Sequence, residues 1–178
     1  NISKKEEYPL ALNLIEYLEK SAKRFPDKLA VSDEKTELTF SELRNYAMSV
    51  ASYIIDAVGT EKKPVAVEVD RCTQSVVMFL AVLYSGNFYV PIDNKMPEDR
   101  VNLILSDINP ILCLNIKEKD FFNGFNVETA CYEKIKNYEI NSKALSLARE
   151  NTIDMDCCYT MYTSGSTGVP KGVVISHR

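Results

Sequence analysis

The sequence predicts an α/β fold in which a parallel-type sheet is flanked by helices. Short apolar segments typical of strands alternate with amphipathic segments typical of helices, and glycine or proline marks many of the boundaries. This alternation favours a parallel sheet with helices on its faces. The chain has 178 residues, of which 46% are hydrophobic. That length suffices for one domain that folds without disulfides or metals, and no linker marks a second domain.

The first third of the chain predicts a helix, a hairpin and a second helix. Apolar residues recur at steps of three and four over residues 12–25, which is the period of an amphipathic helix. Two short segments, 29–32 and 37–40, flank a charged turn and predict a pair of strands. Ser41 then stands where the N-cap of the second helix is expected, and Gly59 stands at its end.

The middle of the chain predicts strands and helices in strict alternation. The β-branched segment 65–69 reads as a strand, Thr73 is a candidate cap for the helix after it, and Gly86 ends that helix before another strand. A further helix is expected to begin near Pro97, because proline is tolerated in the first helical turn. The next strand is expected at residues 111–114.

The last third is harder to interpret. Residues 117–150 lack a sustained hydrophobic period, so we expect irregular structure with a strand near Val127 and a helix after Ser142. The segment 157–161 reads as a strand. Residues 173–175 read as the last strand.

Composition excludes several classes of function. The 21 basic and 25 acidic residues give a net charge of −4, which leaves no positive excess for a nucleic-acid backbone. The longest apolar run, residues 76–84, is roughly half of what a membrane span needs, so we expect a cytoplasmic protein. Five cysteines without a CxxC pair and a single histidine, His177, argue against zinc sites, disulfide frameworks and most histidine-based catalysis.

The segment that carries chemistry is a stretch rich in glycine and hydroxyl groups, residues 162–172. Three of the six glycines of the chain lie between positions 165 and 172. Glycine allows close backbone approach, so that successive N–H groups can converge on an anion, and hydroxyls and a lysine add further donors. We therefore predict a phosphate-binding loop here, since a flexible turn would not need a lysine placed just beyond its glycines.

Two better-known motifs fit this stretch only in part. Gly165 and Lys171 have the Walker A separation, but Pro170 occupies its second glycine position and Gly172 replaces its Ser or Thr. A serine-hydrolase elbow needs a glycine two residues before Ser166, and no acidic residue lies between this serine and the single histidine. A P-loop NTPase and a serine hydrolase are therefore both disfavoured.

The loop resembles the phosphate-binding motif of the adenylate-forming (AMP-binding) superfamily. This superfamily includes acyl-CoA synthetases, luciferases, adenylation domains of nonribosomal peptide synthetases and ligases that load D-alanine onto carrier proteins. Residues 38–43, LTFSEL, resemble its early LTYxEL-type motif, and residues 82–93, VLYSGNFYVPID, resemble its second motif. The resemblance covers nearly the whole chain. The YVPID form of residues 89–93 is similar to the amino-acid-activating members.

The resemblance implies an ATP-dependent ligase. A carboxylate would attack the α-phosphate of ATP to give an acyl adenylate and pyrophosphate, before transfer to a thiol. The implied ligands are ATP, Mg²⁺ brought with the nucleotide, and a small carboxylate or amino acid, and the implied partner is a phosphopantetheinyl carrier protein. Lys171 would be catalytic by offsetting charge on the departing pyrophosphate. The implied nucleotide-binding residues are Thr163, Ser164, Gly165, Ser166, Thr167, Gly168 and Lys171.

Chains of this family continue far beyond the loop. We therefore expect residues 1–178 to be the N-terminal fragment of an AMP-binding adenylation domain, truncated from a larger fold and inactive alone. Two alternatives stay open: an acyl-CoA synthetase of the same superfamily, and a noncatalytic nucleotide-binding or interaction module.

Overall fold

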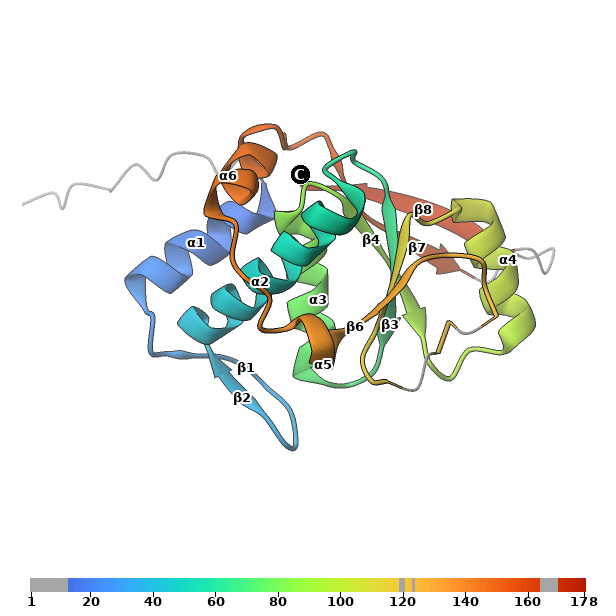
Figure 1. Ribbon diagram of the computed structural model, residues 1–178, viewed down its shortest axis with the longest axis horizontal. Coiled ribbons are helices and arrows are strands. Elements are labelled where there is room, and N and C mark those ends of the chain that lie inside the picture. The colour runs from blue at the N-terminus through green and yellow to red at the C-terminus, as the bar shows by residue number, and fades with distance from the viewer. Residues whose placement is uncertain (1–12, 119–120, 123, 164–169) are drawn as a thin grey trace, which may run out of the picture.

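The computed structural model describes residues 13–118, 121–122, 124–163 and 170–178. Figure 1 shows a central twisted sheet with helices on both faces and a small separate hairpin at one end. The α/β class with a mainly parallel sheet is therefore confirmed. In chain order the described elements are α1 (Leu14–Arg24), β1 (Leu29–Ser32), β2 (Glu37–Thr39), α2 (Phe40–Val58), β3 (Pro64–Val69), α3 (Thr73–Tyr84), β4 (Phe88–Asp93), α4 (Glu98–Ile108), β5 (Leu112–Asn115), β6 (Thr129–Cys131), α5 (Tyr132–Ile135), α6 (Ser142–Glu150), β7 (Cys157–Thr163) and β8 (Lys171–Ser176).

The large sheet has the strand order β6-β5-β3-β4-β7-β8. Neighbouring strands from β6 to β7 run parallel, and β8 returns antiparallel beside β7. Strand β3 lies in the middle, and its residues Val65, Ala66 and Val67 are fully buried. A strand covered on both faces needs such a continuous apolar run, which explains why this segment was predictable.

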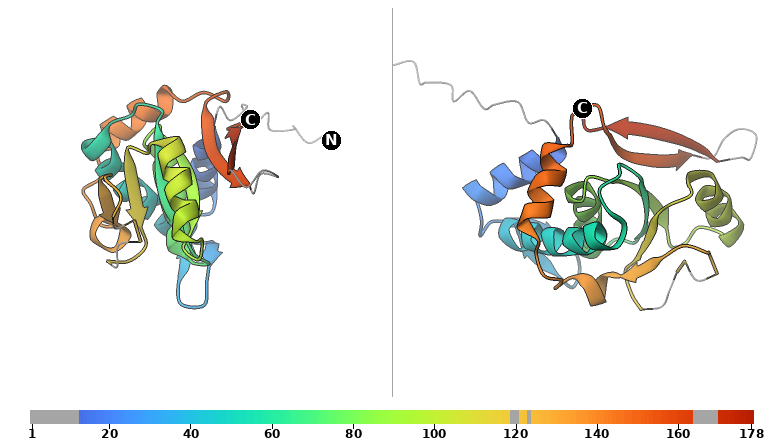
Figure 2. Two further views of the ribbon diagram at one scale, coloured as in Figure 1. Left: turned by 90° about the vertical axis from the view of Figure 1, so that its right-hand side faces the viewer. Right: turned by 45° about the horizontal axis from the view of Figure 1, so that its top comes forward.

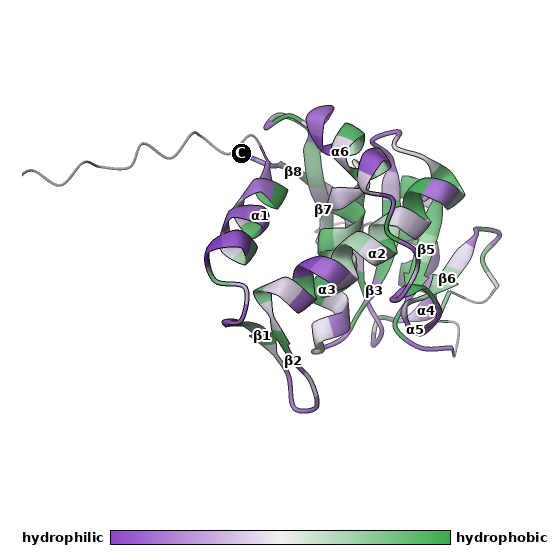
Figure 3. Cartoon of the chain, turned by 60° about the vertical axis from the view of Figure 1, so that its left-hand side comes forward, coloured by the Kyte–Doolittle hydropathy of each residue, from purple (hydrophilic) through white to green (hydrophobic). Residues whose placement is uncertain are grey.

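Two cores lie on opposite faces of the sheet. The larger core joins helices α1, α2 and α3 with residues of β3 and β5. The smaller core lies under α4 and comprises Ala66, Val90, Ile92, Val101, Ile104, Leu105, Cys113 and Phe122. Figure 3 shows the apolar strands at the centre, inside more polar outer segments. In the part of the chain that the structure describes, no helix is both long and apolar enough to cross a membrane.

The start of α2 differs from the sequence prediction. Thr39, and not Ser41, is the N-cap residue, and its hydroxyl accepts the backbone N–H of Glu42 at 3.2 Å. The Glu42 carboxylate in turn accepts the backbone N–H of Thr39 at 2.8 Å. This reciprocal capping box satisfies two N–H groups that the helix cannot, so Ser41 lies inside the first turn. Gly59 ends the helix as expected.

The start of α3 also differs. Thr73 is the first helical residue and not the cap, and Cys72 at the cap position makes no side-chain capping bond. Instead the carboxylate of Asp33, from the turn between β1 and β2, accepts the backbone N–H of Thr73 at 2.7 Å. The same carboxylate accepts the backbone N–H groups of Lys35 and Thr36. The small hairpin therefore caps a helix of the main domain.

Two further expectations are corrected. Phe25, expected on the buried face of α1, is the exposed C-cap residue, while Ile15 and Leu18 are buried. Leu12 lies outside the described residues. In the segment without clear period, the strand expected near Val127 is β6 at residues 129–131 and the helix after Ser142 is confirmed as α6, but helix α5 was not predicted.

Candidate functional site

The hairpin formed by β7 and β8 carries the glycine-rich loop. Thr163 ends β7, Lys171 begins β8, and the two residues are cross-strand partners at the loop end of the hairpin. The hydroxyl of Thr163 donates to the carbonyl oxygen of Lys171 at 3.5 Å. Both side chains are exposed. The structure therefore brings together the two ends of the predicted loop, at its base.

Five of the predicted phosphate-binding residues are not described. Ser164, Gly165, Ser166, Thr167 and Gly168 lie outside the described residues. Of the predicted set, the structure thus places Thr163 and Lys171.

The loop is attached to the sheet at the carboxyl end of β7. This strand lies parallel to β4, with Tyr89 opposite Tyr159. Ligands of open α/β sheets bind outside the carboxyl ends of parallel strands, so the loop starts where the fold offers a ligand site. Figure 2 shows the β7–β8 hairpin along one side of the molecule, with its loop end near α4.

An aromatic stack fixes the first half of β7 to the sheet. The ring of Tyr89 lies between those of Phe79 and Tyr159, with centroids 4.4 Å and 5.3 Å away and nearly parallel planes. Burial raises the pKa of Tyr89 above its ordinary value. Residues 82–93, which resemble the second family motif, thus form the end of α3, the turn at Gly86 and strand β4. Their role in the structure is to pack the strand that carries the loop.

The second half of β7 contacts helix α4 through a residue that the sequence analysis did not single out. The Tyr162 ring packs against the smaller core, and its hydroxyl donates to the carboxylate of Asp107 in α4. Burial raises the pKa of Tyr162, and the hydrogen bond to Asp107 raises it further. Tyr162 is the first residue of the glycine-rich stretch 162–172, but no local pattern connects it with an aspartate 55 residues earlier.

Gly172 allows the tyrosine to lie against the hairpin. It is the cross-strand partner of Tyr162 in β8. A Cβ atom at Gly172 would lie 3.2 Å from Cζ and 3.3 Å from the hydroxyl oxygen of Tyr162, and 3.1 Å from Cγ2 of Thr160. These distances are shorter than ordinary carbon contacts, so a side chain at this position would require the Thr160 methyl group or the Tyr162 ring to shift by a few tenths of an ångström.

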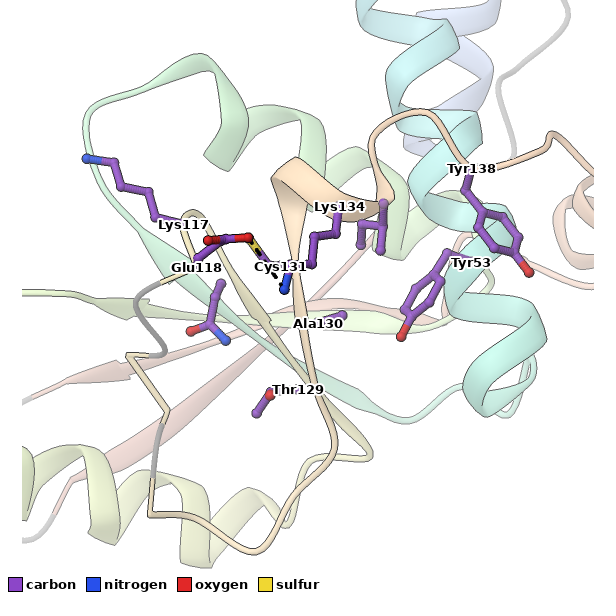
Figure 4. Close-up of a pocket in the computed structure, with 10 residues that line it drawn as sticks. Tyr53, Lys117, Glu118, Thr129, Ala130, Cys131, Lys134 and Tyr138 are labelled. Carbon is purple, nitrogen blue, oxygen red and sulfur yellow. Dashed lines mark ion pairs between the residues drawn. The ribbon is translucent and has the colours of Figure 1, made fainter.

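Two surface hollows lie elsewhere. One hollow of about 460 Å³ lies at β6, the edge of the sheet opposite the hairpin that carries the loop. Figure 4 shows the ion pair between Glu118 and Lys134 on its wall, with a distance of 3.5 Å. Another of about 770 Å³ lies between the β1–β2 turn and the ends of β3 and β5. Neither is lined by Thr163 or Lys171. Among the described residues, no three His, Cys, Asp or Glu side chains gather in a way that could hold a metal ion.

Comparison with known proteins identifies the family. The family described as "AMP-binding enzyme" matches residues 18–178. The chain belongs to the AMP-binding enzyme family. It corresponds to the N-terminal part of that family's domain, and adenylation domains of nonribosomal peptide synthetases at about 30% identity cover the chain. The resemblance inferred from the three motifs is therefore confirmed.

Several curated synthases are similar to this AMP-binding chain. One of the mycosubtilin synthase subunits of Bacillus subtilis is 33% identical over 175 residues, which are 97% of this chain and 6% of that protein. Tyrocidine synthase 3 of Brevibacillus parabrevis is also 33% identical over 175 residues, which are 97% of this chain and 3% of that protein. The chain therefore spans a small part of the length of these relatives.

Solved structures share the fold. VinN has a TM-score of 0.78 at 20% identity, with 95% of this chain and 47% of that chain covered. The N-terminal subdomain of NpsA from Klebsiella oxytoca, in complex with 3-hydroxybenzoyl-AMSN, has a TM-score of 0.76 at 21% identity, with 94% and 41% covered. These similarities confirm the fold that the motifs implied.

Proposed function

We propose that this AMP-binding chain takes part in the ATP-dependent adenylation of an amino acid, for transfer to the thiol of a phosphopantetheinyl carrier protein. The observation that carries the proposal is the pairing of Thr163 with Lys171 at the carboxyl end of β7. This pairing closes the base of a loop whose sequence is rich in glycine and hydroxyl groups. Adenylating chemistry needs such a loop, because two phosphates of ATP leave together as pyrophosphate.

The proposed step is an in-line displacement at the α-phosphate. A carboxylate oxygen of the substrate forms a bond to this phosphorus, and the bond to the bridging oxygen breaks, so that pyrophosphate leaves with the electron pair. The loop residues, from Thr163 through Gly168, would donate hydroxyl and backbone N–H groups to the β- and γ-phosphates. The ammonium group of Lys171 would offset the negative charge that builds on the leaving group.

Magnesium would come with the nucleotide. The described carboxylates do not form a metal site. We therefore assign no residue of this part of the chain to the ion and derive no step through it.

An amino acid is the proposed substrate class for two reasons. Residues 89–93 have the YVPID form similar to amino-acid-activating members of the family. The relatives that cover the chain at about 30% identity include a protein named nonribosomal peptide synthetase TES, from Alternaria alternata. We also propose that the protein works in the cytoplasm, where ATP is available.

The test is carboxylate-dependent exchange between pyrophosphate and ATP, measured with the full-length gene product and a panel of amino acids, fatty acids and aryl acids. Exchange with at least one amino acid supports the proposal. Turnover with fatty or aryl acids and none with any amino acid would assign the protein to the acyl-CoA synthetases. No exchange with any carboxylate would leave a noncatalytic nucleotide-binding module.

Two loop variants test the residues. A hydrogen bond to a charged group contributes roughly 1.5 to 3 kcal/mol, so Thr167→Ala and Lys171→Ala should each slow adenylation by about one to two powers of ten. Lys134→Ala is the matched control, because Lys134 is an exposed lysine at the opposite edge of the sheet. Equal rates for both loop variants and the control would contradict the role of the loop.

A further inference from the structure

The contact between Tyr162 and Asp107 joins β7, the strand that leads into the loop, to helix α4. Tyr162 directly precedes Thr163, the last residue of β7, whereas Asp107 belongs to the last turn of α4. Helix α4 is itself fixed to the sheet, because Val101, Ile104 and Leu105 are buried in the smaller core. The tyrosine therefore connects the base of the loop to a rigid part of the domain.

Three features make this connection specific. The Tyr162 ring packs on the smaller core, its hydroxyl binds the Asp107 carboxylate, and Gly172 on the partner strand leaves the space that the ring occupies. A hydrogen bond to a carboxylate is stronger than one between neutral groups. The ordinary pKa of tyrosine lies well above neutral pH and burial raises that of Tyr162 further, so the hydroxyl remains a donor.

The pairing of β7 with β4 does not extend to the loop end of the hairpin. In the described residues β7 pairs with β4 through the register position Tyr89 opposite Tyr159, three residues before Tyr162. On its other side it pairs with β8, an edge strand that ends the sheet. The direction in which the chain enters the loop at Thr163 then depends on where the Tyr162 side chain is held.

We propose that Tyr162 and Asp107 form a positioning pair that fixes the end of β7 on α4 and so orients the phosphate loop. This inference rests on the proposed function of the loop. The pair contacts no reacting atom. Its expected effect is on how well the loop meets the phosphates of ATP, since displacements of about 1 Å in a positioned group have large effects on rate.

A second tyrosine of the chain provides a matched control. The hydroxyl of Tyr138 donates to the carboxylate of Asp56 at 3.0 Å, so Tyr138→Phe removes the same kind of bond as Tyr162→Phe. Tyr138 lines the hollow at the β6 edge, away from β7 and β8.

The experiment measures pyrophosphate exchange by the full-length gene product while the concentrations of ATP and of the carboxylate are varied separately. Tyr162→Phe and Asp107→Ala should each raise KM for ATP by about three- to tenfold, less than the loss of a direct contact to the phosphates, because the pair acts only through the position of the loop. KM for the carboxylate and the melting temperature should stay unchanged. The double variant should be no worse than either single variant, because both remove one bond. Tyr138→Phe should match the wild type.

Gly172→Ala tests the space beside the ring. We expect it to raise KM for ATP as Tyr162→Phe does, because the added Cβ displaces the ring from Asp107. Its effect should not add to that of Tyr162→Phe. Full additivity would contradict the assignment of Gly172 to the same pair.

The outcomes separate this inference from the proposed function. If Lys171→Ala slows exchange but Tyr162→Phe behaves like Tyr138→Phe, the positioning pair is wrong and the function stands. A parallel change of both KM values and of the melting temperature would show a merely structural role and also contradict the pair. If the wild type catalyses no pyrophosphate exchange with any carboxylate, the proposed function is wrong. The positioning pair is then tested by hydrogen exchange of the β7 and β8 amides. Faster exchange in Tyr162→Phe than in Tyr138→Phe supports the pair, and equal rates contradict it.

Discussion

At the scale of single residues, Asp33 shows how one carboxylate can link separate parts of the chain. It accepts three backbone N–H groups, two within its own turn and one from Thr73 at the start of α3. The N–H bonds, with that of Thr73 first, lower the pKa of Asp33 from 3.8 to about 2. The N-terminal end of a helix also favours a negative charge. The ionised carboxylate is therefore the form that stabilises the fold.

We predict that Asp33→Asn lowers the melting temperature at neutral pH, by about 2 to 4 °C for a domain of this size. Since the folded-state pKa is the lower one, the contribution of Asp33 is fully present above pH 3.8 and is lost as the pH falls toward 2. The difference between wild type and variant should therefore be constant near neutral pH and narrow between about pH 4 and pH 2. Thermal unfolding followed by circular dichroism measures this.

The neighbouring Glu34→Gln is the control for that experiment, because it removes an exposed carboxylate from the same turn. It should leave the melting temperature unchanged at every pH. A pH-independent difference between wild type and Asp33→Asn would show that the charge of Asp33 does not stabilise α3.

At the scale of elements, strand β8 is the exposed edge of the sheet. Val174 is 66% exposed, and Val173 and Ile175 are also exposed. Among the described strands, β8 pairs with β7 alone. An apolar edge strand without a partner is a template for pairing with another chain.

We predict that this chain, expressed as residues 1–178, self-associates through β8, and that Val174→Lys reduces the association. A lysine on an edge strand opposes pairing by its charge. Sedimentation velocity over a range of protein concentrations measures the effect. Ile153→Lys is the control, since Ile153 is an exposed apolar residue outside the strands. If both variants reduce association equally, β8 is not the surface involved.

The order of the elements could be predicted because it depends on local patterns. The buried run of β3, the period of α2 and the glycine stops at Gly59 and Gly86 are all visible in short windows of sequence. The correct cap of α2 was visible too, since Thr39 and Glu42 have the spacing of a capping box. Helix α5 has four residues, which is too short for a hydrophobic period.

The contacts of the site could be predicted only in part. The glycines and hydroxyls predict the loop, and of its predicted residues the structure places Thr163 and Lys171, which lie side by side. The bonds from Asp33 to Thr73 and from Tyr162 to Asp107 span 40 and 55 residues. Such pairs depend on how helices and strands pack, and no spacing rule within one segment reveals them.

At the scale of the whole molecule, the chain covers 41% to 47% of the two solved relatives described above. The proposed phosphate loop lies in this part, and catalysis by positioned residues would need further groups beside it. We predict that residues 1–178 alone form no adenylate, and bind ATP or pyrophosphate weakly, with an affinity that falls as salt is raised. Pyrophosphate exchange and calorimetry at two salt concentrations test this. Turnover comparable to that of a complete adenylating ligase would contradict the expectation that the chain is a fragment.

The strand order also determines when the loop can be completed during synthesis on the ribosome. Strand β3 meets β4 after one helix, so the unit from Pro64 to Asp93 closes from neighbouring stretches of chain. Strand β7 must instead pair with β4 after β5 and β6 have been made, and β8 then adds to β7 as the last strand. Contacts between distant segments form later than local ones, because closing the intervening chain costs entropy. The strands from β3 to β6 can therefore pair first, and the loop that we propose to bind phosphates is placed only when the last hairpin docks.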